Sequence, residues 1–307
     1  MRLTLISHFF TSLQHPWKFV FNVFRRVPHL IPDKLFLQVK YRAKKGIWPN
    51  LDNPQTFTEK INWLKLNDRN PIYTKMVDKY EVKSLVALRI GGKYIIPTLG
   101  IWERAELINW DSLPDQFVLK TTHGGGSNGV VVCTNKSKFN KEQAIAKLNK
   151  SLKSDIFLYF REWPYKNVPR RIIAETFMKD DNAPLGSSLS DYKFYCFNGE
   201  PMYCQVIRDR NTKETIDFYD MDWNHQEFVG LNPVARNGLS PVARPEKLEV
   251  MKDICKKLAK DIPFVRVDLY IINESIYFGE LTFYPASGFG VFTPSEWDAK
   301  LGELLMI

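Results

Sequence analysis

Asp268 and Glu280 lie in residues 264–290, a stretch that reads as two apolar strands around a short polar break. The break at residues 273–275 predicts a β-hairpin with a three-residue loop. A register symmetric about the middle of this loop places Asp268 directly opposite Glu280. Two opposed carboxylates repel each other, so a compensating positive charge is expected, and hard oxygen ligands suit Mg²⁺. The hairpin therefore predicts a divalent-cation site.

The two faces of this hairpin differ in polarity. Side-chain alternation puts Arg266, Asp268, Glu280 and Thr282 on one face. The other face is wholly apolar and consists of Val265, Val267, Leu269, Ile271, Tyr277, Leu281 and Phe283. A solvated polar face, or a surface pair between Arg266 and Asp268, would explain the same pattern without a metal. A one-residue slip of the register would move each side chain to the opposite face.

A glycine-rich segment, His123-Gly124-Gly125-Gly126-Ser127-Asn128-Gly129, lies between two apolar runs at 116–122 and 130–133. Four of its seven residues lack a Cβ, so its backbone N–H groups can approach a phosphate closely. Lys120, on the strand before it, would supply a positive charge. The segment joins strand to strand, which excludes a Rossmann fingerprint or a P-loop because both require a helix directly after the glycines. A tight hairpin without a ligand is the alternative.

Two further charged residues occupy apolar strands. Lys193 follows Asp191 in the predicted strand 191–197, and alternation puts Asp191, Lys193 and Tyr195 on one side. An acid and a base could there face one ligand, and a salt bridge between Asp191 and Lys193 is the alternative. Glu175 closes another apolar strand. It is either an exposed strand end or part of a hinge that offers backbone groups to an adenine.

The chain of 307 residues, 44% apolar and 14% aromatic, can bury a sizeable core in one large domain or in two to three lobes. Its net charge of +9 suggests an anionic partner. The four cysteines show no metal-binding spacing, so a reducing cytoplasm is expected and zinc or a disulfide framework is not. The basic residues are dispersed and no RNA- or DNA-binding motif is present, so nucleic acid is not an expected partner.

The N-terminal residues 1–26 are basic and aromatic. No apolar run in the chain approaches the roughly 18 residues of a transmembrane helix. His8, Gln14, His15 and Lys18 interrupt the N-terminal segment too often for a signal peptide. The segment could lie on a membrane surface, but a helix docked on the protein is the favoured interpretation.

Periodicity and capping signals predict the elements that hold these residues. Residues 1–50 are expected to be helical, and a capping-box pattern from Thr56 to Glu59 opens another helix. Asn198-Gly199 is the strongest hairpin signal in the chain. The remaining expected elements are helices over 71–90, about 141–152 and from Pro245 to Pro263, and strands over 94–99 and 202–208.

The order of these features resembles the ATP-grasp superfamily, and specifically its teichuronopeptide-biosynthesis (TupA-like) branch. The resemblance covers about residues 53–302 and is carried, in this order, by PQTFTEKINWLKLNDRNPIY, VDKYEVKSLVALRIGGKYIIP, LPDQFVLKTTHGGGSNGVVV, RRIIAETFM, DYKFYCFNGEP and FVRVDLYIINESIYFGELTFYPASG. It implies an α+β ATP-grasp fold. The implied parts are an N-terminal helical extension (1–50), a first α/β lobe (51–115), a small glycine-loop lobe (116–178) and a C-terminal antiparallel-sheet catalytic lobe (179–307).

The resemblance also implies roles for individual residues. Its ATP-binding positions match Lys79, Lys120, His123, Gly124, Gly125, Gly126, Ser127, Asn128, Gly129, Glu175, Thr176, Phe177, Asp191 and Lys193. Within this set, Glu175, Thr176 and Phe177 match the adenine hinge, and Asp191 matches the acidic residue near the ribose.

The implied cofactors are ATP and Mg²⁺, and the matching metal ligands are Asp268, Glu280 and Thr282. The superfamily commonly has Glu-x-Asn where this chain has Glu280-Leu281-Thr282, so a hydroxyl replaces an amide at the last position. Arg266 and Lys193 match catalytic positions. Arg266, Ser287 and Gly288 match the region where the acylphosphate and the acceptor meet.

The implied activity is that of an ATP-dependent carboxylate–amine ligase. A substrate carboxylate attacks the γ-phosphate, and an amine then displaces phosphate from the acylphosphate. Phosphoryl transfer needs mainly positioning and charge neutralisation. The branch is associated with cell-surface polysaccharides, which implies that an amino acid or amine is joined to a uronic acid of a glycan or its precursor. The implied location is the cytoplasm, with the inner face of the membrane left open.

A glycosyltransferase is the alternative function. Asp220-Met221-Asp222 has the spacing that holds Mn²⁺ and a sugar-nucleotide diphosphate. A turn that includes Trp223 and Asn224 would explain the same residues without a ligand.

Overall fold

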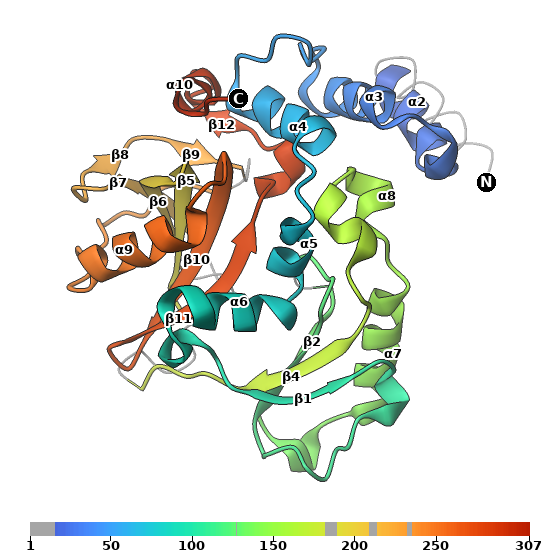
Figure 1. Cartoon of the computed structure of the whole chain (residues 1–307), viewed down its shortest axis with the longest axis vertical. Coiled ribbons are helices and arrows are strands. Elements are labelled where there is room, and N and C mark those ends of the chain that lie inside the picture. Colours follow the sequence, from blue (N-terminus) through green and yellow to red (C-terminus); the bar gives the residue numbers. More distant parts are fainter. Residues whose placement is uncertain (1–15, 127, 182–188, 209–213, 232–234) are drawn as a thin grey trace.

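The computed structural model describes residues 16–126, 128–181, 189–208, 214–231 and 235–307. Within these residues, helices surround two large antiparallel sheets, as Figure 1 shows. One sheet has four strands in the order β1-β4-β2-β3, and the other has six in the order β11-β10-β5-β6-β7-β8. A further two-stranded pair joins β9 (Val229–Gly230) to β12 (Phe292–Thr293). The predicted α+β class is confirmed.

The N-terminal part of the described chain is helical. The helix α2 (Pro16–Phe24) packs on α3 (Asp33–Lys45), where the rings of Phe21 and Phe36 meet edge to face with centroids 5.6 Å apart. The helix α3 ends at Gly46, whose φ of 77° is a left-handed conformation that glycine adopts without a steric cost. The helical extension and its docked helix are therefore as predicted over the described residues, and residues 1–15 lie outside them.

The helix α4 (Phe57–Asn67) begins with the predicted capping box. The Thr56 hydroxyl accepts from the backbone N–H of Glu59, and the Glu59 carboxylate accepts from the backbone N–H of Thr56. The C-terminal helix α10 (Trp297–Leu304) packs on this start. A Cβ on Gly302 would lie 2.2 Å from the carbonyl oxygen of Gln55, so only glycine allows the approach.

The single helix predicted over residues 71–90 is wrong. Two helices form there, α5 (Ile72–Val77) and α6 (Glu81–Ile90). Asp78 separates them, because its Oδ1 accepts from the backbone N–H groups of residues 80 and 81 at 2.8 and 3.2 Å. This side-chain cap starts a new helix and competes with continuation of the old one.

Contacts with distant parts of the chain hold this break in place. The Arg171 guanidinium donates to the second oxygen of Asp78 at 2.8 Å. The backbone N–H of Lys79 donates to the carbonyl oxygen of Thr122 at 3.0 Å. The break therefore places Lys79 beside the glycine-rich segment that follows Thr122.

The four-stranded sheet carries the glycine-rich segment between two of its strands. Its strands are β1 (Thr98–Trp102), β2 (Phe117–Thr121), β3 (Val130–Cys133) and β4 (Ile172–Thr176). The helix α7 (Lys141–Leu152), capped by Asn140 as predicted, covers the face that holds Phe117 and Leu119. The strand–loop–strand prediction is confirmed. The strand predicted over 94–99 begins only at Thr98, because the 3₁₀ turn η2 (Gly92–Tyr94) precedes it.

The six-stranded sheet holds the carboxylate hairpin at one edge. Its strands are β5 (Asp191–Phe197), β6 (Glu200–Arg208), β7 (Thr215–Asp220), β8 (His225–Gln226), β10 (Phe264–Ile272) and β11 (Ser275–Thr282). The predicted turn at Asn198-Gly199 joins β5 to β6. Its φ values of 51° and 89° are both positive, as a type I′ turn requires.

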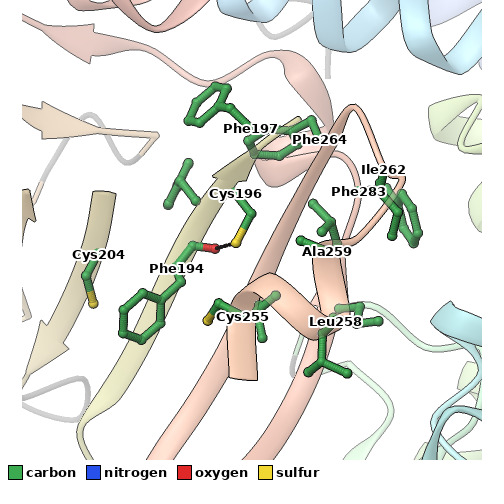
Figure 2. Close-up of a cluster of buried hydrophobic side chains, with 14 of the residues drawn as sticks. Phe194, Cys196, Phe197, Cys204, Cys255, Leu258, Ala259, Ile262, Phe264 and Phe283 are labelled. Atoms are coloured by element: carbon green, nitrogen blue, oxygen red, sulfur yellow. Dashed lines mark hydrogen bonds between the residues drawn. The ribbon is translucent and has the colours of Figure 1, made fainter. Parts of the chain in front are cut away.

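The helix α9 (Leu248–Ala259) packs on one face of the six-stranded sheet, as Figure 2 shows. Phe194, Cys196 and Cys204 from the sheet lie near Cys255 and Leu258 of the helix. Each large apolar side chain buried here stabilises the fold by about 1.5–3 kcal/mol. The buried side chains of this helix include Leu248, Met251, Ile254, Cys255 and Leu258. The four cysteines are buried and free.

The β10–β11 hairpin has the predicted pairing of Asp268 with Glu280, but its loop length and its register differ from the prediction. Its loop has two residues, Asn273 and Glu274, with φ values of 47° and 60°, so the predicted three-residue loop is wrong. A register shift at Gly279 on β11 then adds one residue to that strand. The two departures cancel, and Asp268 lies opposite Glu280 as predicted.

The bulge at Gly279 changes which side chains of β11 are buried between the loop and the bulge. Tyr277, predicted on the apolar face, pairs with Tyr270 on the face of Asp268, and Phe278 takes the buried place opposite Leu269. A Cβ at Gly279 would lie 2.9 Å from the Tyr270 ring and 3.1 Å from the carbonyl oxygen of Asp268. Glycine therefore permits the close approach that the bulge requires.

Over the described ranges, the structure contains no helix that is both long enough and apolar enough to cross a membrane.

Candidate active site

Asp268 is the most buried carboxylate of the hairpin and has two cationic partners. Its side chain is 1% exposed, and the Arg266 guanidinium donates to its two oxygens at 2.6 and 2.7 Å. Lys193, on the neighbouring β5, donates to the same carboxylate. Burial alone would raise the pKa of Asp268, but Arg266 and Lys193 hold it below its usual range. The expected compensation for the opposed carboxylates is therefore present as two side-chain cations.

Glu280, opposite Asp268, is held loosely. Its side chain is 43% exposed, and its closest cations are Arg266 at 3.5 Å and Lys79 at 3.9 Å. Thr282 accepts a hydrogen bond from Arg266 at 3.0 Å. Of the three predicted metal ligands, Glu280 alone therefore has a carboxylate that is not already engaged in short hydrogen bonds. We call Lys193, Arg266, Asp268 and Glu280 the hairpin cluster.

Lys79 connects the two sheets. Its Nζ donates to the carbonyl oxygen of Gly124 at 2.6 Å, in the glycine-rich loop, and lies 3.9 Å from the Glu280 carboxylate of the hairpin. Burial lowers the pKa of Lys79, and the Glu280 charge opposes this shift. The structure thus brings together the predicted loop, the predicted lysine and the predicted carboxylates.

Packing and conformation explain three glycines of the loop. A Cβ on Gly124 or Gly129 would lie 2.4 or 2.2 Å from the Thr121 hydroxyl, so the loop closes around that side chain. Gly126 has a φ of 61°, and, apart from its chain neighbours, no heavy atom of the described residues lies within 4 Å of a Cβ built on it. The loop therefore has open space at Gly126, where a phosphate could approach the backbone.

Other predicted loop residues lie differently. His123 is buried, and its Nε2 lies 3.2 Å from the carbonyl oxygen of Ser151 on α7, while its Nδ1 has no partner among the described residues. Asn128 is exposed, and Ser127 lies outside the described residues.

Glu175 lies between two lysines. Its 7% exposed carboxylate is 2.6 Å from Lys120 and 2.5 Å from Lys83, so it is not an exposed strand end. Burial would raise its pKa, but Lys120 and Lys83 lower it. Lys83 was not among the predicted site residues. It lies in α6, whereas Lys79 precedes that helix, so no helical spacing relates the two lysines. Thr176 and Phe177, the other predicted hinge residues, follow directly and are half-buried.

Lys193 lies between two carboxylates, which fits the salt-bridge interpretation of the Asp191–Lys193 pair. Its Nζ is 3.8 Å from the Asp191 carboxylate and donates to Asp268 on the adjacent strand. Asp191, Lys193 and Tyr195 lie opposite Tyr270, Asp268 and Arg266 in the register, so all six share one face of the sheet. An acid and a base on this face therefore do meet, as the alternation predicts.

Ser287 and Gly288 lie in the 3₁₀ turn η6 (Pro285–Gly288), directly after the hairpin. Three successive residues of this turn have positive φ values, from 46° at Ala286 to 65° at Gly288. Such a run is strained, and strain of this kind gathers at functional sites. The Gly288 carbonyl oxygen accepts from Asn62 at 2.7 Å.

Three buried charged side chains beneath this turn, together with Ser287 of the turn itself, form a second group, which we call the lysine cluster: Lys40, Lys65, Glu162 and Ser287. The Ser287 hydroxyl donates to Glu162, and Lys65 donates to the Ser287 carbonyl oxygen at 2.7 Å. Burial lowers the pKa of Lys65 to about 7 and that of Lys40 to about 6, and it raises the pKa of Glu162. Lys65 and Glu162 were not expected to be buried. Lys65 follows Ile61 by four residues, so helical periodicity places it on the buried side of α4, but a lysine there is ordinarily solvated.

The donor set of the hairpin cluster suits a hard cation. Glu280 offers two loosely held oxygens, and Asp268 and Thr282 offer further oxygens if Arg266 is displaced. A small cavity of about 10 Å³ borders Glu280, Lys79 and Tyr165. A larger one of about 460 Å³ lies beside α6 and is lined by Lys83 and Thr98, among others.

The Asp220-Met221-Asp222 segment forms a turn. Both oxygens of Asp220 accept hydrogen bonds from within this turn, including the backbone N–H groups of Asp222 and Asn224 at 3.0 and 2.8 Å. Trp223 has a φ of 71°. The turn therefore accounts for Asp220 without a metal or a nucleotide.

The family model described as TupA-like ATPgrasp matches residues 59–306. Among solved structures, the D-alanine–D-alanine ligase of Coxiella burnetii matches at 12% identity over 81% of this chain and 64% of that chain, with a TM-score of 0.44. The D-cycloserine synthetase DcsG matches at 17% identity over 76% and 71%, with a TM-score of 0.42. The Helicobacter pylori D-alanine–D-alanine ligase matches at 17% identity over 75% and 61%, with a TM-score of 0.40.

This chain spans about three fifths of the length of the Helicobacter pylori ligase. No curated protein matches the chain. The family match extends over most of the chain, and it includes both sheets and the loop between β2 and β3. The class of protein is therefore that of the ATP-grasp proteins. Within this class, the chain belongs to the TupA-like ATP-grasp family.

Proposed function

We propose that the chain is an ATP-dependent carboxylate–amine ligase that forms an amide through an acylphosphate. The observation that carries this proposal is the meeting of Lys79, Lys193 and Arg266 with Asp268 and Glu280, where the glycine-rich loop of one sheet reaches the hairpin of the other. Family membership supports ATP as the phosphoryl donor.

The reaction has two steps. First, a carboxylate oxygen bonds to the γ-phosphorus of ATP, the bond from that phosphorus to the β–γ bridging oxygen breaks, and ADP leaves. Next, an amine nitrogen bonds to the acyl carbon, the bond from that carbon to the phosphate oxygen breaks, and phosphate and a proton leave. Both steps need charge neutralisation and exclusion of water more than a protein nucleophile.

The side chains of the site fit these needs. Lys79, Lys120 and Lys193 would neutralise phosphate oxygens, and open backbone at Gly126 would let N–H groups donate to them. Glu280 would hold Mg²⁺, with Asp268 and Thr282 as further ligands. Bound Mg²⁺ would add positive charge at the transferring phosphoryl group. Glu175, Thr176 and Phe177 would form the hinge for the adenine, and Asp191 would lie near the ribose.

The proposed substrates are an amino acid or amine and a uronic acid of a cell-surface polysaccharide or its precursor. A net charge of +9 suits an acidic acceptor. Arg266 and the backbone at Ser287 and Gly288 would lie where acylphosphate and acceptor meet. The division into lobes at residues 50, 115 and 178 stays a prediction, as does the cytoplasmic location.

Thermal unfolding with MgATP or a UDP-sugar tests the proposal. MgATP at about one hundred times its Kd should stabilise the wild type by about 2.7 kcal/mol, which raises Tm by several degrees. Glu280→Gln should weaken this shift, whereas the same change at the exposed Glu303 should not. ADP release would then be screened over pairs of amines and uronic acids. Stabilisation by a UDP-sugar alone, unchanged in Glu280→Gln, would refute the ligase proposal.

A further inference from the structure

The helix α2 buries one face and exposes another that is apolar. Trp17 and Phe21 face inward, and Phe21 packs on α3. Phe19 and Val23 are 58% and 44% exposed. These two residues are four apart, so they lie on the same side of the helix, away from the buried side. Packing against α3 therefore covers one side of α2 and leaves the apolar side chains of Phe19 and Val23 uncovered.

Further exposed apolar side chains lie beside α2. Trp48 is 48% exposed and packs edge to face against Trp17, with ring centroids 4.6 Å apart. Leu30, in the short turn η1 (Pro28–Leu30) between α2 and α3, is 68% exposed. Isolated exposed apolar residues are ordinary, but several beside one helix indicate a docking surface.

The charge of this region is strongly positive. Residues 16–48 contain eight lysines and arginines and one acidic residue, Asp33. Asp33 is already paired with Arg69 and Arg161. Basic residues that form no ion pair with any described residue flank the exposed face of α2: Lys18, Arg25 and Arg26.

We propose that the exposed face of α2, formed by Phe19 and Val23 and flanked by Lys18, Arg25 and Arg26, docks on an anionic lipid bilayer. A helix with apolar side chains on one side and basic ones beside them inserts its apolar side among the acyl chains while its cations contact lipid phosphates. The tryptophan beside it suits the membrane interface. A second copy of the same face would bring like charges together, which disfavours self-association.

Flotation of the full chain with phosphatidylcholine vesicles, with and without phosphatidylglycerol, tests this docking. We expect binding to the anionic vesicles, little to the neutral ones, and weaker binding at high salt. Each basic residue near an anionic surface contributes about 1 kcal/mol, so Arg25→Glu/Arg26→Glu should weaken binding at least about tenfold. Phe19→Glu/Val23→Glu should do the same, because the apolar side would then carry negative charge.

Matched variants separate this face from general effects. Leu88→Glu changes an 86% exposed apolar residue on α6, and Lys147→Glu/Lys150→Glu makes the same charge change on α7. Both should bind the anionic vesicles like the wild type, and all variants should keep the wild-type Tm. Failure of the wild type to float with anionic vesicles would overturn the proposal. An equal loss of vesicle binding in Lys147→Glu/Lys150→Glu would overturn it too. A wild-type dimer that dissociates in Phe19→Glu/Val23→Glu would also overturn it.

Discussion

The hairpin cluster and the lysine cluster use the same residue types in opposite ways. In the hairpin cluster, Asp268 has short hydrogen bonds to two cations, and Glu280 is left 43% exposed. In the lysine cluster, all three charged side chains are buried, and Lys65 donates to backbone carbonyl oxygens with no direct bond to a carboxylate. The first cluster keeps one carboxylate available to a ligand, and the second keeps none.

The pKa directions follow from this difference. Paired charges favour ionisation, so the pKa of Asp268 falls although it is buried. Unpaired burial disfavours ionisation, so the pKa of Lys65 falls to about 7 and that of Glu162 rises. Burial would lower the pKa of Arg266, but the Asp268 charge raises it, so this cation of the hairpin cluster stays protonated. The lysine cluster instead ties α3 and α4 to the turn at Ser287, so its role is to position that turn.

The largest effect is expected from Asp268→Asn. Arg266 and Lys193 would be left buried without their anion, which costs about 3–5 kcal/mol. The Tm should fall on the order of 10 °C. Glu280→Gln, at the exposed end of the same cluster, should change stability by less than about 0.5 kcal/mol. Thermal unfolding of both variants checks this contrast, with Asp253→Asn on the exposed side of α9 as the control. Equal losses in Asp268→Asn and Glu280→Gln would contradict it.

Sequence predicted the hairpin cluster well for a physical reason. Strand alternation and hairpin pairing are local, so the Asp268–Glu280 pair followed from the spacing alone. The route was still wrong, because nothing in the sequence signals that Glu274 adopts a positive φ or that Gly279 forms a bulge. The two errors, in loop length and in register, cancel at Asp268 and Glu280, which pair as predicted. They leave Tyr277 on the opposite face of the hairpin from the predicted one.

Features that depend on distant partners were missed. The break at Asp78 depends on Arg171, and helical periodicity continues through it. Lys65 and Glu162 are 97 positions apart, and a lysine on a helix is ordinarily solvated. No local pattern indicates that three helices and a turn will close over such a lysine. The fold class and the loop were therefore accessible from the sequence, but the lysine cluster was not.

The next prediction uses the pH dependence of stability to distinguish the lysine cluster from the hairpin cluster. Between pH 7 and 8.5, folded Lys65 loses its proton while the unfolded chain, with a lysine pKa near 10.5, keeps it. The unfolded state then binds more protons, so the free energy of unfolding rises with pH, by at most about 1.4 kcal/mol per pH unit. Lys40, whose pKa is also lowered, adds a rise of the same sign, so Lys65→Met should remove only the part of the rise that Lys65 contributes, whereas the exposed Lys147→Met should keep all of it. Urea unfolding at several pH values measures the slopes, and identical slopes in all three proteins would exclude a neutral Lys65.

A further prediction concerns Ser287, the residue shared by the proposed acceptor site and the lysine cluster. Its hydroxyl donates to the buried Glu162, so Ser287→Ala should cost about 1–3 kcal/mol because that carboxylate loses a donor. The exposed Ser112→Ala, which removes a hydroxyl bonded to a backbone carbonyl, should cost less than about 0.5 kcal/mol. Chemical denaturation and the acceptor KM should be measured together. If the Ser287 hydroxyl only supports the turn through Glu162, the variant should lose stability while KM changes modestly, because the backbone of the turn would still face the acceptor. Unchanged stability with a large rise in KM would mean that the hydroxyl faces the acceptor, and the two clusters would then share one function.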